Sequence, residues 1–254
     1  MAISSKIPRK VPFECFQPDN ISWTTPAYAY RYVEPRESED FTKRLLTDLD
    51  AHFRNLGPDN VTAFMAETVV GATTGCTTAP AGYFKGVREI CDKYGILLIL
   101  DAGMCGVRHT GTVSLMCSET ALEAFATDRR TKLIPSLCAA TLCVQKIIQR
   151  DGMIETCAQR GKFLESLLEK TFSDTKFPSG GGSYMSMAFE LGVAMYPGMF
   201  MIDGTKGDYI LLAPPYNVTE SELRNIVEVM KRTYDNFEKG FDVKPTGQLP
   251  VGMI

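Results

Sequence analysis

The sequence lacks the features that define membrane-spanning and nucleic-acid-binding proteins. Its longest clean apolar run covers only residues 96–100, far short of the roughly 18 residues that a membrane span needs. Acidic residues outnumber basic ones by 30 to 27, and no local basic excess marks a phosphate-tracking surface. Residues 6–10 are basic, but no apolar stretch follows them as a secretory signal requires. We therefore expect neither a membrane nor a nucleic acid as partner.

Histidine is also scarce, with two residues in the chain. The eight cysteines are scattered through apolar stretches, in a chain large enough to fold without disulfides. They are predicted to be free, buried thiols, which indicates a cytoplasmic protein. Cys105, His109 and Cys117 lack both a fourth ligand and the spacing of a known zinc site. We therefore predict no metal.

Residues 61–100 contain a strand–helix–strand unit. Residues 61–70 and 96–100 have the apolar pattern of buried strands, and residues 80–94 between them place apolar side chains at helical spacing. Pro80 suits a first helical turn, and Gly95 suits the end of the helix. Such a unit joins two parallel strands by a crossover. Strands that are apolar on both sides predict a sheet covered on both faces.

The chain as a whole is predicted to form two domains. Residues 1–130 form an α/β domain, and residues 131–254 form a smaller α+β domain. A helix is expected over residues 38–56, and residues 21–25 are a candidate strand. In the second half, the pattern predicts helices near 133–147 and 154–168 and strands at 184–190 and 209–213. Residues 219–222 form a capping box, Thr-Glu-Ser-Glu, that opens a last helix.

Several ordered segments resemble the class III aminotransferases. Residues 64–72 read FMAETVVGA, where the family usually reads A-E-P-V-V-G-A, and the match continues over residues 82–101, 104–106, 110–112 and 207–219. The resemblance implies the fold type I architecture, pyridoxal phosphate (PLP) as the family's cofactor, and a homodimer. Asp101 matches the aspartate that keeps the pyridine nitrogen protonated, so that the ring acts as an electron sink.

The chain also departs from the family pattern. Thr112 runs almost directly into residues 113–119, which resemble the sequence that follows the Schiff-base lysine in the family. The family's phosphate loop and stacking aromatic have no counterpart in residues 1–60, and the glycines at 180–182 precede a predicted strand instead of a helix. We therefore expect a shortened, lysine-less chain that has lost transamination and uses no cofactor. Asp101 would bind PLP only if the cofactor is retained.

A pocket without its cofactor would still contain titratable groups. Asp101 follows a buried strand, Glu67 lies inside the neighbouring strand, and His109 follows in the loop after Asp101. Histidine is a general base near neutral pH, and paired carboxylates push their pKa values apart. These three residues are the predicted catalytic groups, and Gly103, Met104 and Tyr216 are the predicted substrate pocket.

The favoured function is a repurposed, cofactor-independent acid–base enzyme of isomerase, cyclase or lyase type, acting on a small organic molecule in specialised metabolism. Two alternatives remain open: a noncatalytic partner of a full-length aminotransferase paralogue, and an aminotransferase that retains PLP noncovalently. Structural roles also remain open, because Asp101 can cap its loop and Glu67 can pair with Arg108 or His109. A homodimer is expected because missing segments would expose former core surfaces.

Overall fold

The structure is a computed structural model of the 254-residue chain, and its description covers residues 3–4, 10–32, 38–105, 135–175, 181–198 and 207–238. The chain divides into two compact units, Met1–Glu155 and Thr156–Ile254. The domain boundary predicted at residue 130 lies outside the described residues and stays a prediction. Within the described ranges, no helix is long and apolar enough to cross a membrane.

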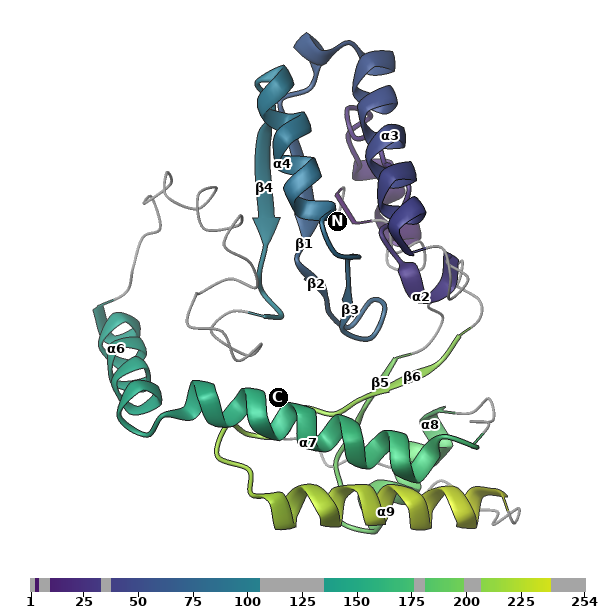
Figure 1. The fold of residues 1–254 in the computed structure, drawn as a ribbon, viewed down its shortest axis with the longest axis vertical. Coiled ribbons are helices and arrows are strands. Elements are labelled where there is room, and N and C mark those ends of the chain that lie inside the picture. The colour runs from purple at the N-terminus through teal and green to yellow at the C-terminus, as the bar shows by residue number, and fades with distance from the viewer. Residues whose placement is uncertain are drawn as a thin grey trace. The chain divides into compact units, whose positions relative to one another are not determined.

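The first unit is built around a pair of parallel strands, β1 and β4 (Figure 1). Residue Ala63 lies opposite Leu97, and Glu67 lies opposite Asp101. The predicted strand–helix–strand unit is confirmed, because the helix α4 connects these two neighbouring strands. The elements of this unit are η1 (Val11–Phe16), α2 (Ala29–Tyr32), α3 (Ser38–Leu56), η2 (Pro58–Asn60), β1 (Ala63–Glu67), β2 (Val69–Val70), β3 (Thr77–Thr78), α4 (Tyr83–Tyr94), β4 (Leu97–Asp101) and α6 (Pro135–Arg150).

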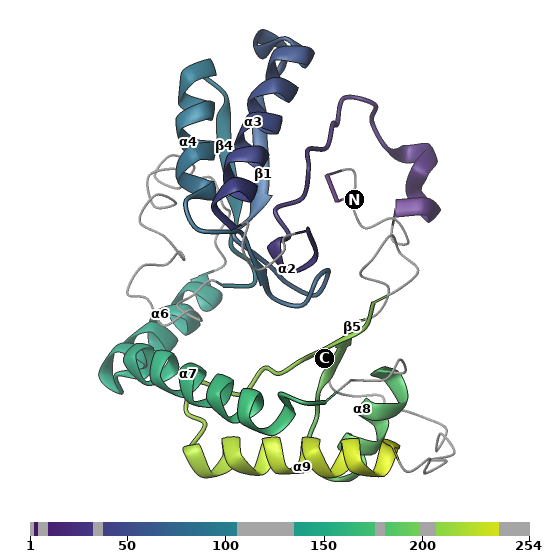
Figure 2. The ribbon, with the colours of Figure 1, turned by 45° about the vertical axis from the view of Figure 1, so that its right-hand side comes forward.

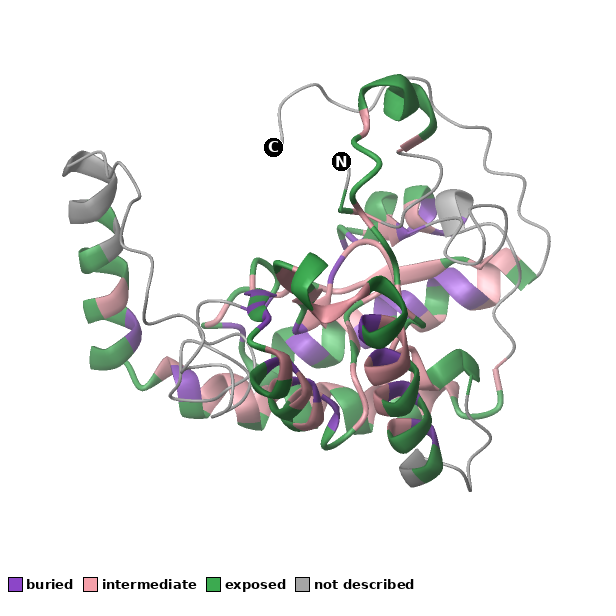
Figure 3. Ribbon diagram, turned by 90° about the horizontal axis from the view of Figure 1, so that it is seen from above, coloured by how far each residue is buried: buried purple, intermediate pink, exposed green. Residues whose placement is uncertain are grey.

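Helices α3 and α4 lie side by side against the same face of β1 and β4 (Figures 1 and 2). Four apolar side chains at helical spacing on α3, Phe41, Leu45, Leu49 and Phe53, are buried, whereas Leu56 is exposed. The four pack against α4 and β4 in one buried cluster. Figure 3 colours buried residues purple along the ribbon. The core residues are Phe41, Leu45, Leu49 and Phe53 of α3, Tyr83, Val87 and Cys91 of α4, and Ile96, Leu98 and Leu100 in and beside β4.

The opposite face of the same strands is open. Leu97 is 53% exposed, and Met65 and Ile99 are each 39% exposed, whereas Leu98 and Leu100 are buried. Successive side chains of a strand point to opposite faces, so the alternation in β4 marks one covered face and one open face. The prediction of a sheet covered on both faces is therefore wrong for the described residues.

Other local predictions fail where packing overrides pattern. Residues 21–25 form no strand, and the predicted strand at 61–70 is divided at Thr68 into β1 and β2. The helix expected near 133–147 is present as α6, with Val144 and Ile147 exposed. The described cysteines are free, as expected, but Cys91 and Cys105 alone among these six are buried.

The second unit packs helices against a short antiparallel strand pair. Its elements are α7 (Met153–Phe172), α8 (Gly181–Glu190), β5 (Tyr196–Gly198), β6 (Tyr209–Leu211) and α9 (Glu220–Glu238). The predicted strand at 184–190 is wrong, because these residues belong to the helix α8. Tyr184, Met187 and Ala188 lie at helical spacing and are buried, and the Tyr184 hydroxyl donates a hydrogen bond to the Met230 carbonyl over 2.6 Å.

The predicted capping box opens α9. The Thr219 hydroxyl accepts a hydrogen bond from the Glu222 main-chain N–H over 3.2 Å. In return, the Glu222 carboxylate accepts one from the Thr219 main-chain N–H over 2.7 Å. The reciprocal bonds satisfy donors that a helix start leaves unpaired. The hydrogen bonds that the carboxylate accepts from the Thr219 main chain and hydroxyl lower the pKa of Glu222.

Candidate functional site

Two carboxylates end neighbouring strands at the same edge of the sheet. Glu67 is the last residue of β1, Asp101 is the last residue of β4, and the two are paired in the register of the parallel strands. Both side chains belong to the open face, in line with Met65 and Ile99. Open α/β sheets bind ligands at the carboxyl ends of their strands. This edge is therefore the candidate site.

A short turn holds one oxygen of the Asp101 side chain. The Gly103 main-chain N–H donates a hydrogen bond to Asp101 Oδ1 over 2.8 Å. Asp101 is exposed, and no hydrogen bond from another described residue reaches its Oδ2. At the strand tip, Gly103 thus orients Oδ1, and the described residues leave Oδ2 without a hydrogen bond.

The predicted pocket residues Gly103 and Met104 belong to this turn. A Cβ at Gly103 would lie 3.1 Å from Asp101 Oδ1, which is a tight approach. The side chain of Met104 covers Gly71, where any Cβ would run into it. Met104 itself is 38% exposed, so it forms an apolar border beside Asp101.

Glu67 differs from its predicted state. The side chain is exposed, so the expectation of a buried carboxylate inside the strand is wrong. Partial desolvation raises the pKa of Glu67, and the neighbouring Asp101 carboxylate raises it further, against a hydrogen bond from the Gly71 main chain that lowers it. Two carboxylates at one strand edge thus hold a proton on Glu67 more readily than an isolated glutamate would.

The structure does not place the other predicted site residues relative to this edge. His109 lies outside the described residues, as do its expected partner Arg108 and the thiol Cys117. Tyr216 belongs to the second unit, where burial raises the pKa of its hydroxyl and its carbonyl accepts a hydrogen bond from Arg160 Nη1 over 3.4 Å. The roles of His109 and Tyr216 stay predictions.

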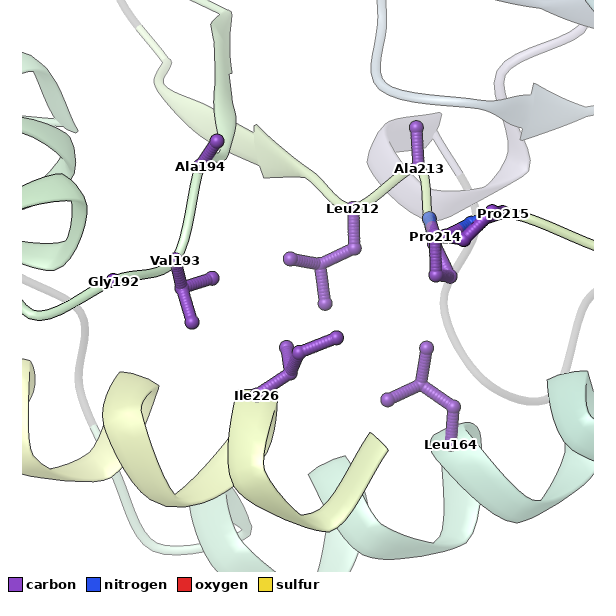
Figure 4. A pocket seen from close by; sticks show the side chains of 9 residues that line it. All are labelled: Leu164, Gly192, Val193, Ala194, Leu212, Ala213, Pro214, Pro215 and Ile226. Atoms are coloured by element: carbon purple, nitrogen blue, oxygen red, sulfur yellow. The ribbon is translucent and has the colours of Figure 1, made fainter. Parts of the chain in front are cut away.

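A separate apolar pocket of about 220 Å³ lies within the second unit. Leu164 of α7 and Ile226 of α9 point toward Val193 and Leu212 (Figure 4). Pro214 and Pro215 border it, and none of the described residues that line it is titratable. The sequence did not predict this pocket, because its walls come from four segments whose proximity no local pattern reveals.

Comparison with known proteins agrees with the resemblance. Residues 1–121 match the family described as aminotransferase class-III. An uncharacterized aminotransferase of Schizosaccharomyces pombe is 32% identical, over 92% of this chain and 64% of that protein. An aminotransferase of Gibberella zeae is 29% identical, over 91% of this chain and 58% of that protein. The chain thus spans less than two thirds of these relatives.

Solved structures show the same fold. An omega transaminase from Pseudomonas jessenii in complex with PMP has a TM-score of 0.74 at 21% identity, covering 94% of this chain and 66% of its own. An omega-transaminase from Thermomicrobium roseum has a TM-score of 0.70 at 22% identity, covering 89% of this chain and 63% of its own.

The fold and the strand-edge site therefore define an α/β chain with the fold type I architecture of transaminases. Its first 121 residues match the class III aminotransferase family, as its motifs predicted. The expectation that the chain uses no cofactor is contradicted by this family match and by a structural neighbour that holds PMP, the aminated form of PLP. The predicted cofactor-independent isomerase, cyclase or lyase depended on that expectation and is therefore no longer supported.

Proposed function

We propose that this chain binds PLP and that Asp101 holds the protonated pyridine nitrogen of the cofactor. The observation that carries the proposal is the oriented, exposed Asp101 carboxylate at the carboxyl end of β4, with Oδ2 available to a ligand. An ionised carboxylate is the acceptor that a pyridinium N–H requires. The donor set therefore fits the ring nitrogen of PLP.

When bound, PLP supplies an electron sink for amino-group chemistry on a small molecule. Asp101 contributes orientation and charge, because Gly103 fixes one of its oxygens. Glu67, with its raised pKa, can hold a proton beside Asp101 and release it at this edge of the sheet. Met104 packs over Gly71 on one side of the turn.

We also propose that the cofactor is held without a covalent bond to a lysine of the chain. The alignment with the Schizosaccharomyces pombe relative runs over 299 positions, at least 45 more than the 254 residues here. Sequence is therefore missing from this chain inside the aligned range, and the order of the family-like motifs suggests a break after Thr112, where the family carries its lysine segment. Retained PLP would then depend on noncovalent contacts such as that of Asp101.

The decisive experiment uses PMP, which has no aldehyde and cannot react with surface lysines. Calorimetric titration of the purified chain with PMP should show one saturable site. In a parallel sample, one equivalent of PLP should show the absorbance spectrum of a bound cofactor. After borohydride reduction of that sample, mass spectrometry should find the chain without a covalently attached cofactor. Failure to bind PMP would overturn the cofactor proposal, and stoichiometric attachment to one lysine would overturn the noncovalent one.

The open sheet face also supports self-association, with Met65, Leu97 and Ile99 exposed. Contiguous apolar patches mark interaction sites. We expect a homodimer in sedimentation at micromolar concentration, and Leu97→Lys should shift it toward monomer, whereas Leu56→Lys on α3 should not. A clean monomer would contradict the homodimer. That result would favour the second candidate, a partner of a longer aminotransferase, which the same face supports.

A further inference from the structure

Thr68, which directly follows Glu67 between β1 and β2, is one of two buried polar residues in the described chain. It is 6% exposed. Its main-chain N–H donates a hydrogen bond to the Asp101 carbonyl over 3.1 Å. Its hydroxyl lies 3.5 Å from the same carbonyl and 2.9 Å from Cys105 Sγ. A single side chain thus contacts both ends of the turn that begins at Asp101.

Cys105 closes the other end of that turn. It is 3% exposed, and its thiol also reaches the Ala102 carbonyl at 3.8 Å. Buried polar groups need partners, and the Thr68 hydroxyl and the Cys105 thiol serve each other. Because residues 101–105 are held at both ends, the Gly103 N–H stays directed at Asp101 Oδ1.

We propose that Thr68 is a positioning residue for Asp101, acting through its main-chain hydrogen bond to Asp101 and its hydroxyl contact with Cys105. It touches no reacting atom itself. A proline at this position, as in the family pattern, has neither an N–H nor a hydroxyl and could make neither contact. The consequence for PLP rests on the proposed function, but the positioning can be measured in the free protein.

The first test follows hydrogen exchange of the Gly103 amide by NMR. In the wild-type protein this amide should exchange slowly, because it donates to Asp101 Oδ1. Asp101→Ala removes the acceptor and should speed the exchange. Thr68→Val removes the hydroxyl at nearly constant shape and should speed it at least about twofold, whereas Thr68→Ser should retain the wild-type rate.

Cys105→Ala tests the same contact from the opposite side and should reproduce the effect of Thr68→Val. The Leu98 and Leu100 amides, in the core strand, report whether each variant is folded. If Gly103 exchanges at the wild-type rate in folded Thr68→Val and Cys105→Ala, the positioning role is wrong. If Thr68→Val does not fold, the Cys105→Ala result decides alone.

The second test measures PMP affinity. Loss of one hydrogen bond should weaken binding about 3- to 10-fold in Thr68→Val, and Thr68→Ser should restore it. Absence of PMP binding in the wild-type protein would contradict the proposed function, while the exchange rate of Gly103 would still decide the role of Thr68. Unchanged PMP affinity in folded Thr68→Val would contradict the positioning role.

Discussion

Asparagine in place of Asp101 should weaken PMP binding by about 10- to 100-fold. A charge-assisted hydrogen bond to a ligand is worth about 1.5–3 kcal/mol, which corresponds to this loss of affinity. Asparagine is nearly isosteric, and its side-chain oxygen can still accept the hydrogen bond from Gly103. The free energy of unfolding should therefore stay within about 0.5 kcal/mol of wild type. Calorimetry and urea denaturation measure the two quantities.

Asp92→Asn is the matched control for this substitution. Asp92 lies on α4 and pairs with Arg88 on the same helix, away from the strand tips. It should leave PMP affinity unchanged. Equal losses in both variants, or no loss in Asp101→Asn, would remove Asp101 from the site.

Asp101→Asn should also lower the pKa of Glu67, and this effect can be measured without a cofactor. The Asp101 carboxylate raises the pKa of Glu67, second to the effect of desolvation. Removing that charge should lower the pKa of Glu67, since its ionised form would no longer face a second negative group. An NMR titration of the Glu67 carboxyl carbon measures this, and a pKa that does not move would show that the two groups do not interact.

Truncation of Leu49 to alanine should destabilise the first unit by about 2–5 kcal/mol. Leu49 is 1% exposed and packs in the cluster between α3, α4 and β4. Alanine at this position would leave a cavity that rigid helix–sheet packing cannot fill. Urea denaturation followed by circular dichroism should show the loss as a lower midpoint.

Leu56, at the end of the same helix, is the control because it is 41% exposed. Leu56→Ala should cost less than about 1 kcal/mol, since little apolar area leaves water there. Similar losses in the two variants would mean that the buried stripe of α3 does not organise the core.

Much of the fold followed from local patterns. The helix at 38–56 was predicted with the bounds of α3, and the crossover between β1 and β4 was predicted from two apolar runs around one amphipathic segment. The strand predicted at 184–190 is wrong, because the apolar residues of this segment fit both the repeat of a helix and that of a strand. Burial of Tyr184, Met187 and Ala188 against α9 decided for a helix.

The candidate site was predicted in part. Asp101 could be found because a carboxylate after five aliphatic residues marks a strand tip. The environment of Glu67 could not, because its exposure depends on whether anything covers the face that it shares with Met65 and Ile99. Thr68 was missed, because nothing local distinguishes a buried threonine that contacts Asp101 and Cys105 from one that faces solvent.

By itself, therefore, the sequence determined the strand–helix–strand unit, the capping box of α9, the resemblance to class III aminotransferases and the residue at the tip of β4. All of these depend on short-range periodicity or on contiguous motifs. Only the tertiary structure decided which sheet face stays open, that Glu67 and Asp101 share one edge in register, and that Thr68 and Cys105 hold the turn between them. These features join residues more than 30 positions apart, and their contacts exist only once the chain has folded.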